Sequence, residues 1–246
     1  MLNLMNPFSL EGKRALVTGA SKGLGYATAQ QLKALGAEVI VSARGQAELE
    51  IAALELGAKA VSADVSTLEG VQKLKNVVGA VDILVINAGG PKAGGALSVT
   101  ESDWDAGYQL TFLSAVRLVE AFLPAMREQS WGRIIAITSM TVTRPNPNLV
   151  VSNALRAAVT NYLRTLALEV AQENITVNTV APGFFATERL NSLYNDSQME
   201  AVKNSVPMNR IGDPLEFGAA VAFLASRGAS YITGQSLEVN GGFGIR

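Results

Sequence analysis

The chain has 246 residues, of which 48% are hydrophobic and 17% charged, and this composition favours one large folded domain and excludes a disordered chain. Its formal net charge of -1 provides no basic field for nucleic acid or for an anionic membrane. Because it contains neither cysteine nor histidine, disulfides, thiolate chemistry, a Ser-His-Asp hydrolase and a zinc enzyme are excluded.

Short apolar runs alternate with longer helical patterns along the chain. We expect strands over residues 14–18, 38–42, 60–62, 83–86, 133–138, 176–180 and 236–239. We expect helices over residues 24–35, 46–56, 68–78, 104–128, 152–171 and 214–226, with Gly36 and Gly57 ending the first two.

This alternation predicts an α/β fold with a doubly wound parallel sheet of the Rossmann type, formed by residues 1–246 as a single domain. Strands with few polar residues are typical of a parallel sheet that is buried on both faces. Two loop-like stretches, residues 140–148 and 184–210, follow strand C-terminal ends, where such sheets bind ligands. We expect the second stretch to form a lid over the substrate.

The segment from Thr18 to Gly25 joins the first strand to the first helix and reads Thr-Gly-Ala-Ser-Lys-Gly-Leu-Gly. In such a loop Gly19 allows a tight turn, Gly23 lets backbone N–H groups approach a pyrophosphate, and Gly25 lets helix and strand pack closely. The helix N-terminus adds partial positive charge. A tight turn without a ligand is the plainer alternative, but the strand–turn–helix context favours a dinucleotide site.

The residues after the second strand indicate the form of the cofactor. Sites for NAD usually carry an acid there, whereas this chain has Ser42, Ala43 and Arg44. We expect Arg44 to pair with a 2′-phosphate, Lys22 to add a second positive charge, and Ser42 to donate a hydrogen bond. The alternative is that the two cations are solvated surface charges. NADP(H) is therefore the expected cofactor.

Further motifs follow in order at Asp64-Val65, at Asn87-Ala88-Gly89 and at Pro182-Gly183 with Thr187. Together with the glycine loop, they resemble those of the short-chain dehydrogenase/reductase family over nearly the whole chain, and most of all those of 3-oxoacyl carrier-protein reductases. The resemblance, with the reading of the cations above, implies a set of cofactor-binding residues: Gly19, Ser21, Lys22, Gly23, Leu24, Gly25, Ser42, Arg44, Asp64, Val65, Asn87, Ala88, Gly89, Pro182, Gly183 and Thr187.

The catalytic residues that the resemblance implies depart from the family's Asn, Ser, Tyr and Lys. Ser139 stands at the serine position. Thirteen residues later Ser152 stands where the family has tyrosine, and four residues further on Arg156 stands where it has lysine. Thr111 stands at the asparagine position, seven residues after Trp104. Three of the four usual residues are therefore replaced.

Ser152 cannot take over the tyrosine's role unchanged, because its aliphatic hydroxyl is much less acidic than a phenol with a pKa of about 10. Arg156 stays protonated and cannot relay protons. The two side chains lie one turn apart on the predicted helix. With Ser139, they can present two hydroxyl donors and a fixed cation to a carbonyl oxygen, as an oxyanion site does. An inactive site is the alternative.

We expect an NADPH-dependent oxidoreductase that transfers hydride to a carbonyl or a conjugated enone. The alternatives are a C=C reductase specifically, and a non-catalytic NADP(H)-binding sensor or scaffold. Lys92 and Arg144 are candidate anchors for a substrate carboxylate or phosphate, or else solvated charges, and Tyr194 is a candidate substitute acid. The resemblance implies a homotetramer. We expect a small-molecule substrate, neither nucleic acid nor membrane as a partner, and a cytoplasmic location.

Overall fold

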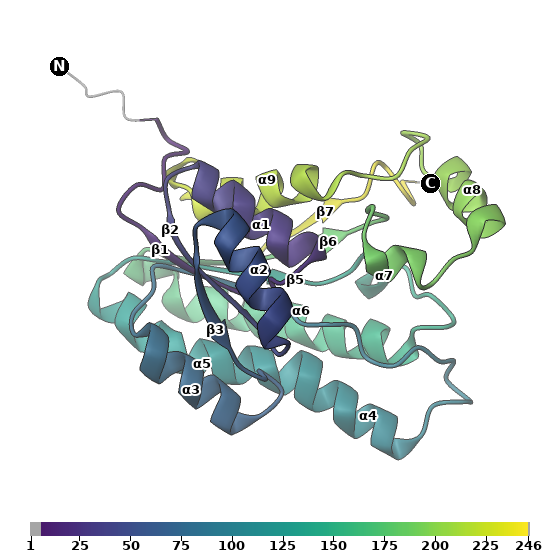
Figure 1. The fold of residues 1–246 in the computed structure, drawn as a ribbon, viewed down its shortest axis with the longest axis horizontal. Helices are drawn as coiled ribbons and strands as arrows, with labels where there is room; N and C mark the ends of the chain where they lie inside the picture. The colour runs from purple at the N-terminus through teal and green to yellow at the C-terminus, as the bar shows by residue number, and fades with distance from the viewer. Residues whose placement is uncertain (1–5, 246) are drawn as a thin grey trace.

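The computed structural model describes residues 6–245, so that residues 1–5 and 246 of the predicted domain lie outside the described part. Within residues 6–245, seven parallel strands form one sheet in the order β3-β2-β1-β4-β5-β6-β7 (Figure 1). The strands are β1 (Arg14–Thr18), β2 (Glu38–Ala43), β3 (Lys59–Ser62), β4 (Ile83–Ile86), β5 (Gly132–Ile137), β6 (Ile175–Pro182) and β7 (Ser236–Val239). This confirms the doubly wound Rossmann-type fold.

Helices cover both faces of the sheet (Figure 1). One layer holds α1 (Gly23–Ala34), α2 (Gln46–Leu56) and α9 (Pro214–Ala225). The other holds α3 (Leu68–Val78), α5 (Ser114–Glu128) and α6 (Val150–Val170). Each layer has its own hydrophobic core, because successive residues of a strand face opposite ways. Leu16 of β1 packs into the α3–α5–α6 core, and its neighbour Val17 packs into the α1–α2–α9 core.

The order of the strands places the ligand site. From β1 the chain winds outward through β2 to β3, and it then returns to β4 on the other side of β1. In open sheets of this kind ligands bind beyond the strand C-termini, where the winding direction reverses. That position lies at the carboxyl ends of β1 and β4.

The helix expected over residues 104–128 is not one regular α-helix but consists of three consecutive helical segments. It begins as α4 (Glu101–Gly107), continues as a π-helical segment η1 (Tyr108–Leu113), and ends as α5. By length and composition alone the span Glu101–Glu128 could cross a membrane. Its residues Leu118 and Phe122 are instead buried in the core. Wide turns of this kind are frequent at functional sites.

The stretch over residues 184–210, expected to be loop-like, contains two short helices, α7 (Glu188–Asn191) and α8 (Asp196–Ser205). Each begins with a side chain that accepts a hydrogen bond from the first turn. Thr187 accepts from the Leu190 N–H, and Asn195 accepts from the Gln198 N–H. These capping residues are the sequence signal for the two helices.

Candidate active site

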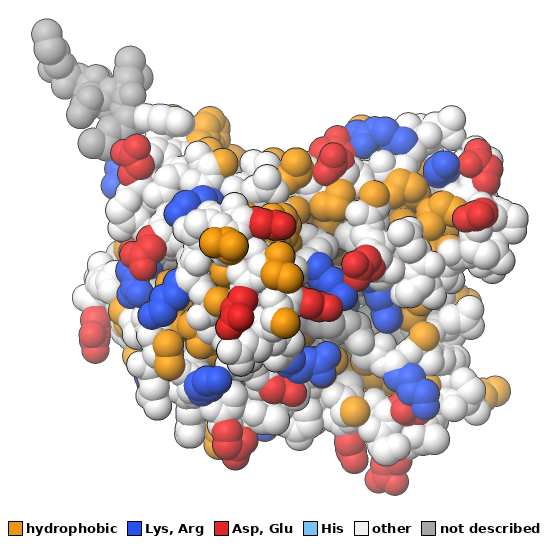
Figure 2. All heavy atoms as spheres, viewed as in Figure 1, with side chains coloured by type: hydrophobic (Ala, Val, Ile, Leu, Met, Phe, Trp, Pro, Cys, Tyr) orange, Lys and Arg blue, Asp and Glu red, His pale blue; other side chains and the backbone are white. Residues whose placement is uncertain are grey.

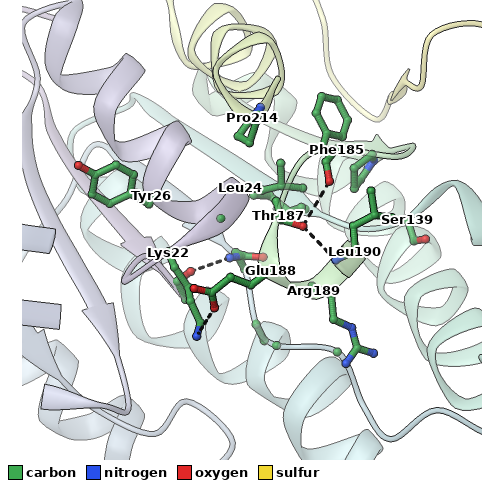
Figure 3. A pocket seen from close by; sticks show the side chains of 18 of the residues that line it. Lys22, Leu24, Tyr26, Ser139, Phe185, Thr187, Glu188, Arg189, Leu190 and Pro214 are labelled. Atoms are coloured by element: carbon green, nitrogen blue, oxygen red, sulfur yellow. Dashed lines mark hydrogen bonds and ion pairs between the residues drawn. The ribbon is translucent and has the colours of Figure 1, made fainter. Parts of the chain in front are cut away.

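A cavity of about 1060 Å³ opens at the carboxyl ends of the strands, with α7 as one wall (Figure 3). Its lining contains fifteen of the sixteen predicted cofactor-binding residues. Gly25 is absent from the lining and has a packing role instead. A Cβ atom on Gly25 would overlap the carbonyl oxygen of Gly19, which is the close approach of helix and strand that the sequence predicts.

The glycine loop is fixed to the end of β4. Gly19 has a φ of 58°, and a Cβ atom there would lie 2.8 Å from the Asn87 carbonyl oxygen. The Asn87 side chain donates a hydrogen bond to the Gly19 carbonyl at 3.0 Å. Helix α1 then begins after Lys22, whose side chain provides no cap for the first-turn N–H groups. Uncapped N–H groups at the start of a helix, beside a cavity, suit a pyrophosphate.

The two predicted phosphate-binding cations differ in their surroundings. The Lys22 Nζ lies 2.8 Å from the Glu188 carboxylate and 3.9 Å from that of Glu48, and Glu188 raises the pKa of Lys22 (Figure 3). Arg44 is exposed, and its side chain forms no hydrogen bond or ion pair with residues 6–245. The Ser42 side chain is buried, and its hydroxyl has no partner among the described residues. Of the two cations, Arg44 is therefore the one whose side chain has no partner among residues 6–245.

The two predicted hydroxyl donors both line the cavity. Ser139 follows β5, and its Oγ accepts a hydrogen bond from the Thr141 N–H at 3.1 Å. Ser152 lies in the first turn of α6, and its Oγ accepts from Arg156 Nε at 3.2 Å. The oxygen of each serine hydroxyl therefore accepts one hydrogen bond from the protein itself. The hydroxyl protons remain available for an acceptor in the cavity.

Arg156 is anchored to the end of β5. Its Nη1 donates to the carbonyl oxygens of Ile137 at 2.8 Å and Thr138 at 3.0 Å. Burial, and secondarily the charge of Arg189, lower its pKa to about 10, so that Arg156 stays protonated at neutral pH. The guanidinium is the fixed cation that the sequence predicts, and it also orients Ser152.

Thr111 does not join these residues in the large cavity. It lies on η1 and lines, together with Arg156 and Ser114, an adjoining cavity of about 20 Å³. Its hydroxyl is buried and has no partner among the described residues. Thr111 and the two serines thus line different cavities, and Arg156 lines both.

The two candidate anchors for a substrate anion are neutralised and lie outside the cavity lining. Lys92 pairs with Asp103 at 3.0 Å, and Arg144 pairs with Glu238 at 2.7 Å. Arg189 lines the cavity in their place. The sequence reading missed it, although its position two residues after Thr187, at the start of the lid, was a signal.

The lid also provides aromatic side chains. Tyr194 and Phe184 line the cavity, with ring centroids 6.2 Å apart in an edge-on contact. Phe243 lies edge-on against Phe184 at 5.2 Å. The lid therefore contributes an aromatic surface to the cavity, next to the charged side chains of Glu188 and Arg189. The side of the cavity formed by the glycine loop is polar. Figure 2 shows basic and acidic side chains close together on this face of the molecule.

Comparison with known proteins gives matches along nearly the whole chain. A family model described as enoyl-(acyl carrier protein) reductase matches residues 19–244. The 3-oxoacyl-(acyl-carrier-protein) reductase FabG of Vibrio cholerae is 40% identical over 240 residues, which covers 95% of this chain and 98% of that protein.

Solved structures of reductases are also similar to the chain, at lower sequence identity. The L-sorbose reductase of Gluconobacter frateurii, solved with NADPH and L-sorbose, has a TM-score of 0.90 and 30% identity, covering 98% of this chain and 100% of that one. YwfH, an NADPH-dependent reductase involved in bacilysin biosynthesis, has a TM-score of 0.88 and 28% identity, covering 94% and 97%.

Proposed function

The chain belongs to the short-chain dehydrogenase/reductase family of oxidoreductases, and on that premise we propose that it is an NADPH-dependent reductase of a carbonyl or conjugated enone substrate. Of the two, reduction of the C=C bond of a conjugated enone fits the site better. The observation that carries this choice is the pair of hydroxyls on Ser139 and Ser152, both free to donate, with no phenol beside them on α6.

The cofactor side of the cavity supports NADPH. Arg44 is the unpaired cation beside the end of β2, and Ala43 leaves no carboxylate there to bind a ribose hydroxyl or repel a phosphate. The L-sorbose reductase structure contains NADPH, and YwfH is described as NADPH-dependent. Bound NADPH would supply the hydride. Gly19, Gly23 and the start of α1 would hold its pyrophosphate.

The chemistry follows from what the substituted side chains can do. A ketone becomes an alcohol only if a proton reaches its oxygen, and neither a serine hydroxyl nor a buried guanidinium is a good acid at neutral pH. When hydride adds to the β-carbon of an enone, the C=C electrons move to the oxygen as an enolate. Ser139 and Ser152 stabilise that oxygen by donating hydrogen bonds. The α-carbon then takes its proton from water.

The test is a screen of NADPH oxidation against a ketone, a β-ketoacyl thioester and an enone, followed by product analysis. We expect a saturated ketone from the enone and little turnover of the simple ketone. Formation of an alcohol as the sole product would contradict C=C reduction. Tight cofactor binding with no oxidation above background in any class would favour a non-catalytic sensor.

A further inference from the structure

Besides Arg44, which lies exposed beside the end of β2, the cavity holds two arginines that no carboxylate of residues 6–245 neutralises. Arg189 reaches from α7 to the loop after β4, where its guanidinium lies against Gly90: a Cβ atom there would be 2.9 Å from an Arg189 Nη atom. Figure 3 shows the Arg189 side chain pointing away from the Lys22–Glu188 pair. The Arg189 side chain forms no hydrogen bond or ion pair with residues 6–245.

The second cation is Arg156, whose side chain donates, within the described part of the chain, to a serine hydroxyl and to two backbone carbonyls. Arg189 is near enough for its charge to lower the pKa of Arg156. Two like charges in one partly buried cavity are unfavourable unless an anion joins them. The carboxylates in the lining lie elsewhere: Glu188 and Glu48 are at Lys22, and Asp64 is bound to Ser66.

We propose that Arg189, with Arg156 behind it, forms an anion subsite that binds a carboxylate of the substrate beside the reacting carbon. A guanidinium presents paired donors that match a carboxylate, and a desolvated site strengthens that contact. The aromatic side chains of Phe184 and Tyr194 on the lid would hold the apolar body of the same molecule. The substrate class is thus a compact, apolar enone or ketone that bears one carboxylate.

The inference rests on the proposed function, because it places the anion next to the carbon that accepts hydride. A rival source of negative charge is the cofactor diphosphate, since Arg189 also lies near the loop after Asn87. Binding measurements separate the two sources. If Arg189 serves the substrate, its removal leaves the affinity for NADPH unchanged.

The experiment uses 3-benzoylacrylate and its methyl ester, which share a ring and an enone and differ in one charge. Isothermal titration calorimetry measures the binding of each to the full chain at saturating NADP⁺. We expect the acid to bind about ten- to hundredfold more tightly than the ester, the range of a charge-assisted contact. Arg189→Gln should abolish that preference, and Arg189→Lys should keep part of it.

Lys92→Gln is the matched control, because Lys92 is an exposed cation near the cavity that already pairs with Asp103. It should leave the acid-over-ester preference intact. Equal binding of acid and ester, no detectable binding of the acid, or an unchanged preference in Arg189→Gln would overturn the subsite. So would a tenfold loss of NADPH affinity in Arg189→Gln with the preference retained.

Oxidation of NADPH by the ester, measured separately, tests the proposed function itself. A preference for the acid that depends on Arg189, without oxidation of NADPH, would support the subsite and contradict the proposed reductase activity. Oxidation of the ester without any preference for the acid would keep the reductase and overturn the subsite.

Discussion

Arg156 donates a hydrogen bond from Nε to the Oγ of Ser152, 3.2 Å away and one turn earlier on α6. The bond fixes the serine oxygen as an acceptor on that side, so its proton can only be donated elsewhere. Arg156 therefore supplies more than a positive charge, because it determines which way the neighbouring hydroxyl points.

Removing the Arg156 side chain should lower kcat more than it weakens the binding of NADPH. Arg156→Ala deletes both the fixed charge and the orientation of Ser152, and loss of one oxyanion donor typically costs about 10²–10³-fold in rate. We expect at least that loss in kcat for an enone, with the NADPH dissociation constant within a few-fold of the parent. Arg164→Ala, an exposed arginine on the same helix, is the control. Full activity in a folded Arg156→Ala variant would refute the assignment.

The two serines should substitute for one another in part. Ser152→Ala leaves Ser139 as a donor, and Ser139→Ala leaves Ser152, so each single change should cost less than Arg156→Ala. The double variant loses both donors and should fall by about 10²–10³-fold. Steady-state kcat values for the three variants check this. If both single variants keep full activity, the proton and charge chemistry lies elsewhere, and Tyr194→Phe is the next variant to measure.

The fold could be predicted from local patterns, because many separate strand and helix patterns along the chain indicate the same alternation. Several elements have the expected bounds, among them α2, α3, β1, β4 and β7. The π-helical segment around Thr111 could not be predicted, because it differs from an α-helix only in its i→i+5 hydrogen bonds and is six residues long. α7 and α8 were missed because each is short and lacks a strong apolar stripe, although Thr187 and Asn195 are good caps.

Most of the predicted site residues line one cavity, but the sequence did not show which cations are paired and which are not. The motifs place Ser139, Ser152 and Arg156 in one cavity, as expected. Which cations are free depends on their tertiary partners, which no local pattern shows. Lys92 proves to be paired, whereas Arg189 proves to be free.

Arg44 should determine the preference for NADPH over NADH. A charge-assisted contact to a 2′-phosphate contributes ~1.5–3 kcal/mol, which is about ten- to hundredfold in affinity. Arg44→Ala should lose most of that preference. Lys22→Ala should lose less, because Glu188 already engages Lys22 at 2.8 Å. Fluorescence titrations with both cofactors provide the comparison, and equal affinities in the parent protein would argue against NADP(H).

Activity should be flat between pH 6 and 9 and decline near pH 10. No histidine or cysteine is present to titrate in that range, and Arg156 has its pKa lowered to about 10. Above that pH the guanidinium loses its charge. Because burial lowers the folded pKa of Arg156 below the ordinary value for arginine, this group makes the fold more stable as pH rises through 10, so unfolding from this source would not mimic the decline. A kcat/KM profile with a titration near pH 7 would point to another acid.

We expect the protein to be a homotetramer in solution. Leu168, Tyr231 and Leu237 are exposed apolar side chains on α6 and around β7, where self-complementary patches can pair. Light scattering at micromolar concentration should give about four times the chain mass of 25.8 kDa. Tyr231→Glu should shift the assembly to a smaller species. A monomeric parent protein would contradict the prediction.

The site formed by Ser139, Ser152 and Arg156 should stabilise an enolate and should not protonate a ketone oxygen. The most direct test is to supply NADPH labelled with deuterium at the transferred position, together with a neutral enone such as 4-phenyl-3-buten-2-one, and to locate the label in the product by NMR. The account predicts deuterium on the β-carbon of a saturated ketone. Deuterium on the carbon that bears a new hydroxyl would contradict it.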